Sequence, residues 1–397
     1  MNDDADVAWL CEASDRWTNW LLGAAMPLWA GLGVDPVNGG FQEAIDVDGR
    51  QALAIPRRGR VQPRQIYSVI EAGRLGWTGD WEGIANRALD WYLGRFRLND
   101  GTFADLVAPD GALLESRFDL YNQAFALFGL AHAAAALPER RADLEAIAIT
   151  LLDRLETQYR HPQAGFEESV PASEPLRANP HMHLLEAALF WERIGGGARW
   201  SALADGIMEL ALARFIDPTT GALREYFTRD WRPMPDDRGR QIEPGHLFEW
   251  AWLALRWAKK RNRADATTAA RRLFDVGEAR GICPTRKVAV LEVNDDFSPR
   301  APVARLWGQT EWIKAALALA LVSSGTERRH YLSSARQAVA ALEMFLVDDP
   351  VGLWRDKLGE DGRFVAEPAP ASSLYHIVCA ISELQHVRHC TWPDASR

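Results

Sequence analysis

Three of the nine histidines in this sequence stand at the same kind of position, where a polar cluster gives way to a long apolar run. They are His183, His246 and His376. Histidine is the side chain whose ordinary pKa lies closest to neutrality, so it suits proton transfer to and from a substrate. One such histidine alone is more often a structural residue. Three at matching positions favour a shared chemical role.

Two of these histidines belong to a His-x-x-Glu element, His183-Leu-Leu-Glu186 and His246-Leu-Phe-Glu249. Residues three apart share one face of a helix, so we expect each carboxylate to lie beside its imidazole and to orient it. A metal site is the competing interpretation, because helical bundles hold metals with Glu-x-x-His and further inward glutamates. Such glutamates are not evident, and HExxH is absent. We therefore predict no metal.

Composition and the missing motifs exclude several other classes of function. The sequence has no GxGxxG, GxxxxGK or GxSxG segment, so we expect no nucleotide cofactor and no serine nucleophile. A net charge of −9 argues against a nucleic-acid partner. No uncharged run of about 18 apolar residues indicates a membrane span. The acidic start MNDDADVAWL does not resemble a secretory signal, and the four cysteines lack CxxC spacing, so we expect a cytoplasmic protein.

The elements that must position the histidines are indicated by an internal repeat. Residues 198–214 have the spacing of an amphipathic helix, whereas 246–258 are apolar nearly all round, as in a buried helix. Each unit therefore contains an outer helix, a β-hairpin loop and an inner helix. Six units that cannot bury their apolar faces alone must pack together. We predict one all-α domain over residues 1–397, a ring of six helical hairpins. Glycine-led segments mark the units at intervals of about 60 residues, beginning at Gly40, Gly101, Gly165, Gly221, Gly281 and Gly352.

In a closed ring, the starts of the inner helices lie at one end. Polar residues from six units then converge on one mouth, which favours a ligand site with a few convergent polar groups. Five other histidines are predicted to lie on outer faces, in loops or in the tail, with surface or structural roles: His132, His161, His330, His386 and His389.

Taken in order, these motifs resemble the N-acylglucosamine 2-epimerase family, which includes mannose and sulfoquinovose isomerases and cellobiose 2-epimerases. The resemblance runs from the first unit to the last, and its two histidine-centred motifs are the most specific. The matching segments are Arg60-Val-Gln-Pro-Arg64-Gln65, Tyr121-Asn-Gln-Ala-Phe125, Asn179-Pro-His-Met-His183-Leu-Leu-Glu186, Glu243-Pro-Gly-His246-Leu-Phe-Glu249, Arg305-Leu-Trp307-Gly-Gln309-Thr-Glu311 and Tyr375-His376.

This resemblance implies an (α/α)6 barrel and proton transfer at carbons 1 and 2 of an aldose, without a metal or redox cofactor. It implies that His246 and His376 form the general acid/base pair and that His183 binds substrate hydroxyls or assists ring opening. An arginine beside an enediolate oxygen could stabilise its developing charge. The residues implied to line the pocket are Arg64, Tyr121, Asn179, Glu249, Trp307 and Gln309.

The segment from Glu243 to Trp250 is most similar to the mannose-isomerase branch, which implies a monosaccharide substrate and interconversion of D-mannose and D-fructose. The preceding loop, 231–240, is expected to place an arginine over the substrate. Arg238 is our choice, with Arg232 and Arg240 as alternatives. The sequence leaves open which sugar is preferred and whether the chain forms a homodimer.

Three other functions stay open at this point. A sugar 2-epimerase acting on N-acetylglucosamine or cellobiose would use the same histidines, with bases on both faces of carbon 2. A glycoside hydrolase needs two carboxylates across the scissile bond, and Asp119, Glu167 and Glu311 are the candidates. A non-catalytic binding protein would leave the convergence of three histidines with Arg64 unexplained.

Overall fold

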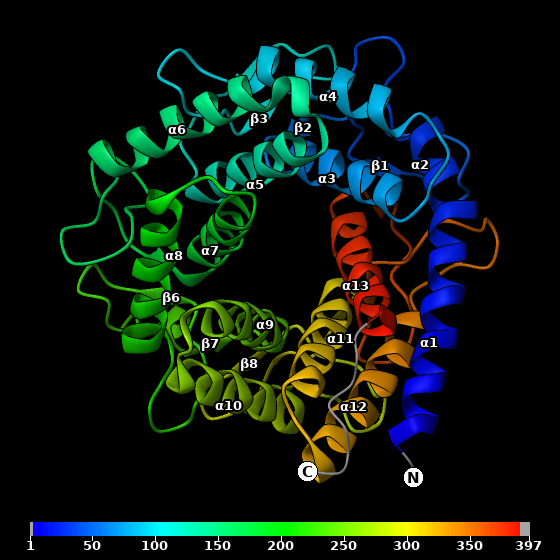
Figure 1. The fold of residues 1–397 in the computed structure, drawn as a ribbon, viewed down its shortest axis with the longest axis vertical. Coiled ribbons are helices and arrows are strands. Elements are labelled where there is room, and N and C mark those ends of the chain that lie inside the picture. The colour runs from blue at the N-terminus through cyan, green and yellow to red at the C-terminus, as the bar shows by residue number, and fades with distance from the viewer. Residues whose placement is uncertain (1–2, 390–397) are drawn as a thin grey trace.

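Helices in two concentric rings make up the computed structural model, which describes residues 3–389 (Figure 1). Each inner helix packs against the outer helix that follows it in the chain, with α1 in that place for the last inner helix, and against the next inner helix. The inner ring contains α3 (Val61–Arg74), α5 (Leu120–Ala136), α7 (Ala178–Arg193), α9 (Pro244–Arg261), α11 (Leu306–Leu321) and α13 (Ser372–His389). The outer ring contains α1 (Asp3–Trp20), continued by Leu21–Ala25 and α2 (Met26–Gly31), then α4 (Trp81–Phe96), α6 (Arg141–Gln158), α8 (Ala198–Leu210), continued by Ala211–Phe215, α10 (Ala264–Gly281) and α12 (Gly325–Glu343).

The apolar pattern of each helix decides its ring. The inner helix α5 is rich in alanine, leucine and phenylalanine and is buried along most of its length. The outer helix α10 buries one stripe, including Leu273 and Phe274, and turns its charged residues to solvent. The predicted (α/α)6 barrel of six helical hairpins is therefore confirmed. The inner position of α5 corrects one expectation, because His132 lies on this helix, only 8% exposed, and not on an outer face.

Short strands gather at the end of the barrel where the inner helices begin. The predicted Asp-Gly turns form, as between β3 (Leu106–Val107) and β4 (Leu113–Glu115). Most strand pairs, however, join neighbouring units, and β1 (Ala44–Ile45) with β12 (Ala369–Pro370) closes the ring. The other strands are β2 (Arg57–Arg58), β5 (Leu176–Arg177), β6 (Tyr226–Phe227), β7 (Gln241–Ile242), β8 (Glu292–Asn294), β9 (Pro299–Ala301), β10 (Ala304–Arg305) and β11 (Lys357–Leu358).

Histidines elsewhere in the chain lie in varied surroundings. His161 is buried in a loop, where Trp231 contacts it. His330 lies on the outer helix α12, half exposed, and His386 lies near the end of α13. The side chain of His389 is outside the described part of the molecule.

Side-chain amides fasten the hairpins to the inner helices. In three units a glutamine in the first turn pairs with both backbone groups of one hairpin residue: Gln62 with Phe41, Gln123 with Phe103, and Gln309 with Ala289. In the third unit His181 accepts the equivalent bond from the Phe166 backbone amide at 3.0 Å. These buried bonds fix the height of each hairpin on its helix, since an unpaired buried backbone group is costly.

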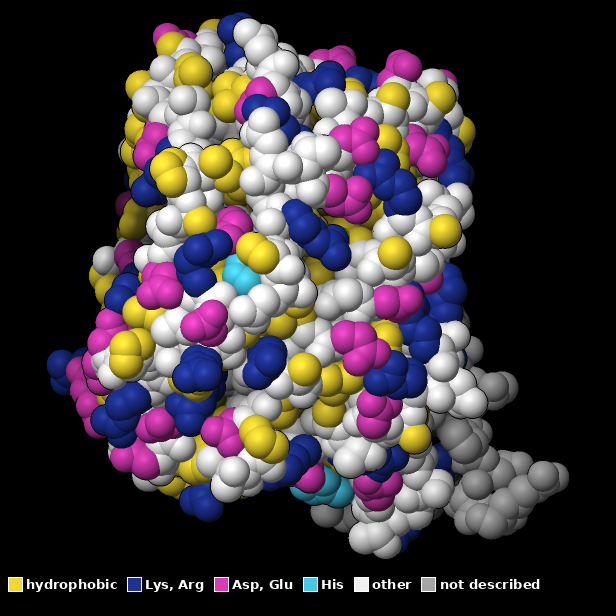
Figure 2. All heavy atoms as spheres, turned by 90° about the vertical axis from the view of Figure 1, so that its left-hand side faces the viewer, with side chains coloured by type: hydrophobic (Ala, Val, Ile, Leu, Met, Phe, Trp, Pro, Cys, Tyr) yellow, Lys and Arg dark blue, Asp and Glu magenta, His cyan; other side chains and the backbone are white. Residues whose placement is uncertain are grey.

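The outer surface carries both signs of charge. Figure 2 shows lysine and arginine side chains interspersed with aspartate and glutamate over the face that carries α6 and α8. Within residues 3–389, no helix is long and apolar enough to cross a membrane.

The glutamine pairing generates a stability prediction. Replacing Gln309 by leucine should lower the free energy of unfolding by about 1–3 kcal/mol, because the Ala289 amide and carbonyl are left unpaired in the interior. Urea denaturation followed by circular dichroism measures the change. The matched control is Gln51→Leu, at an exposed loop position. Equal stability of the two variants would show that the pairing contributes nothing.

Candidate active site

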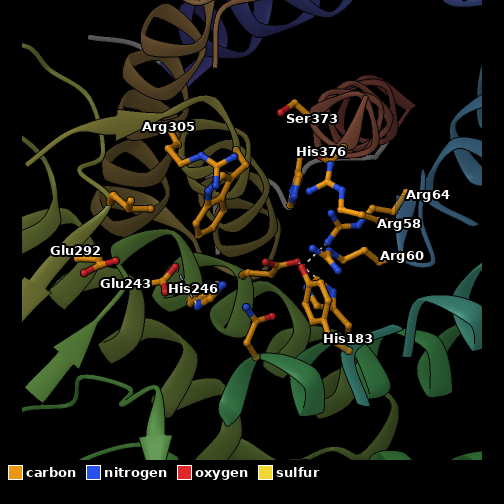
Figure 3. Close-up of a pocket in the computed structure, with 16 residues that line it drawn as sticks. Arg58, Arg60, Arg64, His183, Glu243, His246, Glu292, Arg305, Ser373 and His376 are labelled. Carbon is orange, nitrogen blue, oxygen red and sulfur yellow. Dashed lines mark hydrogen bonds and ion pairs between the residues drawn. The ribbon is translucent and has the colours of Figure 1, made fainter. Parts of the chain in front are cut away.

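A cavity of about 340 Å³ opens at the hairpin end of the barrel and draws residues from all six inner helices or the segments leading into them (Figure 3). The three histidines point into it from α7, α9 and α13. Convergence of the polar helix starts, predicted from the repeat, is therefore present. The lining residues are Arg58, Arg60, Arg64, Tyr121, Asn179, His183, Glu243, His246, Glu249, Leu291, Glu292, Arg305, Trp307, Ser372, Ser373 and His376.

His246 is a cationic histidine held by two carboxylates. Its Nδ1 donates to Glu225 Oε1 at 2.9 Å and lies 3.6 Å from Glu243 Oε2. Burial alone would lower the pKa of His246, but Glu225 and Glu243 outweigh burial and raise the pKa well above its usual value. Burial in turn raises the pKa of Glu243 to about 7. The titrations of His246 and Glu243 therefore depend on each other.

The surroundings of His376 favour the neutral form of its ring, the opposite of His246. Its Nδ1 donates to Glu311 Oε1 at 2.9 Å, and the other Glu311 oxygen pairs with Lys314 Nζ at 2.5 Å. Burial, reinforced by the positive charges of Arg64 and Lys314, lowers the pKa of His376 well below the usual value. The bond to Glu311 places the proton of the neutral ring on Nδ1, so Nε2 is the atom left to accept a proton.

Lys314 is a fully buried cation that two carboxylates share. Its Nζ lies 3.9 Å from Glu249 Oε1 as well as beside Glu311. Burial raises the pKa of Glu249 well above its usual value, and the charge of Glu311 adds to that effect. A carboxyl that keeps its proton at neutral pH can donate to a substrate oxygen, and Glu249 Oε1 has no hydrogen-bond partner among the described residues.

His183 forms the predicted pair with its own helix, whereas His246 does not. His183 Nδ1 lies 3.1 Å from Glu186 Oε2, which also accepts a bond from the Tyr375 hydroxyl. Burial lowers the pKa of His183 to about 4, and the charge of Arg64 acts in the same direction. In the second element, Glu249 lies 4.0 Å from His183 and does not pair with His246, so that part of the prediction was wrong.

Arg64 brings a positive charge to the cavity without a carboxylate partner among the described residues. Its guanidinium lies 3.8 Å from the centroid of the Phe125 ring and donates to the Tyr121 hydroxyl. Both the Arg64 Nε and the Asn179 Oδ1 are buried, and neither has a hydrogen-bond partner in the part of the chain that the structure describes. Because unpaired buried polar atoms are costly, these atoms are suited to a polar ligand.

Trp307 separates the two acid/base candidates. Its ring centroid lies 5.0 Å from that of His246 and 5.9 Å from that of His376. Gly245 permits this placement, since a Cβ there would lie 2.3 Å from the Trp307 ring. An indole face between two imidazoles offers an apolar surface to a sugar ring.

Glu225 is the important residue that the sequence analysis missed. Acids at the equivalent place in other hairpins hold the polar start of an inner helix: Glu43 holds Arg58, Glu168 holds Arg177, and Asp356 holds Arg305 and Ser373. In the fourth unit the partner is His246. The signal was present in the sequence, because an acid follows the leading glycine by three or four residues in five of the six segments.

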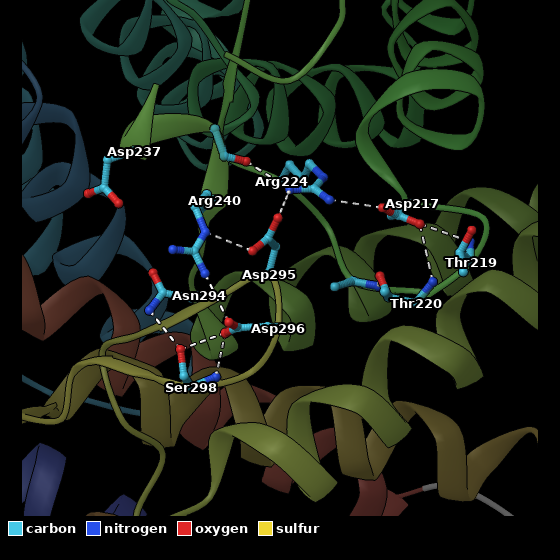
Figure 4. A network of polar contacts seen from close by, with 12 residues as sticks. Asp217, Thr219, Thr220, Arg224, Asp237, Arg240, Asn294, Asp295, Asp296 and Ser298 are labelled. Carbon is cyan, nitrogen blue, oxygen red and sulfur yellow. Dashed lines mark hydrogen bonds and ion pairs between the residues drawn. The ribbon is translucent and has the colours of Figure 1, made fainter. Parts of the chain in front are cut away.

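A polar network fixes the loops around Glu225 (Figure 4). Arg224 bonds Asp217 and Asp295, each at 3.0 Å, and Arg240 bonds Asp295 and Asp296. The loop of β8 that this network holds supplies Glu292 to the cavity. The network therefore positions the wall beside His246.

Two predicted placements, that of a loop arginine and that of Gln309, are not found. Arg238 pairs with Asp236 and is exposed, Arg240 belongs to the network just described, and Arg232 is exposed, so no arginine of the 231–240 loop lines the cavity. Gln309 is fully buried behind the wall, where it pairs with Ala289. Loop length and backbone pairing, which the sequence does not show, decide these positions.

The three hydrolase carboxylates do not form a pair across the cavity. Asp119 caps α5 and pairs with Arg177, Glu167 pairs with Arg229, and Glu311 lies below His376. None of the three lines the cavity. The arrangement gives no support to the two-carboxylate mechanism.

The inward glutamates that were not evident from the sequence are present. Two triads have ligand atoms within 4.8 Å of one another, His183 with Glu186 and Glu249, and His246 with Glu225 and Glu243. Histidine and carboxylate are suitable ligands for zinc. In both triads, however, a protein cation already balances the carboxylates: Lys314 beside Glu249 in the first, and the His246 imidazolium in the second.

The cavity continues into an adjoining compartment of about 480 Å³. The two share Arg58, Arg60, Tyr121 and Asn179. Burial lowers the pKa of Arg60, and the nearby charges of Arg58 and Arg64 lower it further. Two guanidinium groups therefore face the passage between the two spaces, those of Arg58, which pairs with Glu43, and Arg60, which lies 3.5 Å from Asp105. Their charges favour an anionic group there.

The cavity therefore offers a proton donor, His246, and a proton acceptor, His376, at different places in its wall. It contains a cationic imidazole, a neutral imidazole and an unpaired guanidinium. Environments that separate the pKa values of two titratable groups indicate acid and base roles.

Comparison with known proteins places the chain in a family. A sequence model described as N-acylglucosamine 2-epimerase (GlcNAc 2-epimerase) matches residues 39–380. A protein of Rhizobium meliloti (strain 1021) named mannose-6-phosphate isomerase is 52% identical over 368 residues, covering 92% of this chain and 95% of the relative.

Solved structures show the same fold at low sequence identity. A crystal structure of a D-mannose isomerase has a TM-score of 0.83 at 20% identity and covers 94% of this chain and 98% of its own. The cellobiose 2-epimerase of Spirochaeta thermophila DSM 6192 has a TM-score of 0.84 at 20% identity, with coverage of 96% and 98%. With a matching sequence model over most of its length and a relative of this similarity, the chain belongs to the N-acylglucosamine 2-epimerase family.

Proposed function

We propose that this protein is an aldose–ketose isomerase that interconverts D-mannose and D-fructose through a cis-enediol, without a metal or redox cofactor. The observation that carries the proposal is the pair of histidines that face one cavity, His246 beside the carboxylate of Glu225 and His376 beside Glu311, which pairs with the buried Lys314. The similarity to a relative named as an isomerase supports the same class of reaction.

The proposed steps assign each proton to a named group. The neutral His376 takes the C2 proton of the open-chain aldose while the His246 imidazolium protonates O1, which gives the enediol. His246 then takes the O2 proton, and His376 returns its proton to C1, which gives the ketose. Arg64 and the protonated Glu249 donate hydrogen bonds to oxygens on which charge develops. His183 and Asn179 hold substrate hydroxyls.

A proton-exchange experiment tests the reaction. Chelator-treated protein is incubated with D-mannose in D2O and followed by proton NMR. Fructose should appear with deuterium at C1, mannose re-formed in the reverse reaction should carry deuterium at C2, and His376→Ala should lower kcat/KM by about 10²–10⁴-fold because the base is lost. His330→Ala, on the outer helix α12, is the control. Formation of a C2 epimer without ketose would favour the 2-epimerase alternative, and loss of activity that a divalent metal restores would contradict the cofactor-independent mechanism.

The electrostatic assignment predicts a change in the pH profile. Activity needs His246 protonated and His376 neutral, so kcat/KM should fall at low pH as His376 gains a proton and at high pH as the His246 cluster loses one. In Glu225→Gln the imidazolium loses its closest carboxylate, its pKa falls, and the alkaline limb should move to lower pH while the acidic limb stays in place.

Glu168→Gln is the matched control for this profile, since Glu168 occupies the equivalent hairpin position but holds Arg177. It should leave both limbs unchanged. If the alkaline limb of the Glu225→Gln profile does not move, the assignment of His246 as the general acid is wrong.

A second candidate substrate is mannose 6-phosphate. The arginines at the passage to the adjoining compartment favour an anionic group, and the Rhizobium relative carries the corresponding name. In this alternative the same proton transfers take place while Arg58 and Arg60 hold the phosphate.

One variant distinguishes mannose 6-phosphate from mannose as the substrate. If the phosphorylated sugar is used, Arg60→Gln should lower kcat/KM for mannose 6-phosphate by about 10–100-fold and change that for mannose by less than about threefold, because a charge-assisted bond is lost only for the phosphate. Arg50→Gln, in an exposed loop, is the control. An equal loss for both sugars would assign Arg60 to the sugar ring and favour the unphosphorylated substrate.

A further inference from the structure

A second and larger cavity lies at the opposite end of the barrel, where the inner helices end. It has a volume of about 580 Å³ and receives residues from all six inner helices. We call it the distal cavity. Glu186 lies in the layer between the two cavities: it lines the distal cavity and bonds His183 Nδ1 and the Tyr375 hydroxyl on the catalytic side. Ligands in the two cavities would therefore not compete for the same space.

Aromatic rings form one wall of the distal cavity and enclose His132. The His132 ring centroid lies 3.5 Å from that of Phe190, 4.4 Å from that of Phe128 and 4.5 Å from that of Tyr67. His132 is 8% exposed, lines the cavity and makes no hydrogen bond to any described residue. Trp252 continues the wall, and its buried indole nitrogen also has no partner there. A buried polar group without a partner in the wall of a cavity is suited to a ligand.

Positive charge faces these rings in excess. Arg74 pairs with Glu71, and Arg256 pairs with Glu383. In contrast, Arg193 and Lys259 have no carboxylate within ion-pair distance in the described part of the chain. The Arg193 guanidinium lies over the Phe190 ring at 4.2 Å. Burial and the arginines Arg193, Arg74 and Arg256 also lower the pKa of His132 well below its usual value, so the ring is neutral and can accept a hydrogen bond.

We propose that the distal cavity binds an aromatic organic anion, whose ring lies against Phe190 and Trp252 and whose acidic group pairs with Arg193 and Lys259. His132 bonds a polar atom of the same ligand. Aromatic side chains bind an aromatic ligand by burying apolar surface and by edge or face contacts between the rings. An exposed guanidinium beside them pairs with the acidic group of the ligand. The proposal stands apart from the sugar reaction, because it uses none of the residues assigned to that reaction.

Isothermal titration calorimetry on the full chain tests this, with naphthalene carboxylate as the probe and naphthalene methanol as its neutral counterpart. The carboxylate should bind one to one with a Kd below about 1 mM, and the alcohol about tenfold or more weaker. Arg193→Gln should weaken carboxylate binding by about tenfold, since one charge-assisted bond is lost. His132→Leu should weaken it as well, with circular dichroism to verify that the variant is folded.

Two control variants locate the site. Arg214→Gln removes an exposed arginine of the outer ring, and Arg60→Gln removes one from the mouth of the catalytic cavity. Both should bind the carboxylate as the unaltered protein does, and saturating D-mannose should not displace it. The proposal is overturned if no saturable binding occurs, if the alcohol binds equally well, or if Arg60→Gln abolishes binding while Arg193→Gln does not. Because Arg193 is exposed, its replacement tests the proposal even if His132→Leu fails to fold.

Discussion

The structure depends on the attachment of each hairpin to the polar start of an inner helix. Acids at one recurring hairpin position bond arginines, a serine or a histidine there, and first-turn glutamines pair with the hairpin backbone. These bonds lie among apolar helices, where leaving any polar group unpaired is costly. The hairpins are therefore fixed over the mouth of the barrel, and the six helix starts face one cavity.

This attachment also explains how one unit became chemically distinct. In the fourth unit the group held by the hairpin acid is an imidazole instead of a guanidinium. An arginine stays charged at any ordinary pH, whereas a histidine between two carboxylates is a cation that can still release its proton. The hairpin acid of the fourth unit thus holds a group that can release its proton, whereas those of the first and third units hold guanidinium groups.

The charged groups beneath the cavity favour a different protonation state for His376 than for His246. Lys314 is buried between Glu249 and Glu311, and Glu311 in turn holds His376. Burial lowers the pKa of His376, and the nearby positive charges of Arg64 and Lys314 lower it further, whereas two carboxylates raise the pKa of His246. The hairpin end and the distal end of the barrel also differ in how their charged groups are paired. Histidines and carboxylates in close contact line or underlie the cavity at the hairpin end, while the distal end combines aromatic rings with two cations that have no carboxylate partner among residues 3–389.

The sequence by itself determined the six-unit repeat, the inner and outer helices and the gathering of His183, His246 and His376, because apolar periodicity and repeat position fix which helix faces the centre. It also placed Arg64, Tyr121, Asn179 and Trp307 in the cavity. Only the tertiary structure decided the partners: Glu225 beside His246, Lys314 beneath Glu311, Gln309 against a hairpin backbone, and the arginines of the 231–240 loop away from the site. Those contacts join residues from different helices and hairpins, and their distances follow from ring closure and loop conformation, which local sequence patterns do not encode.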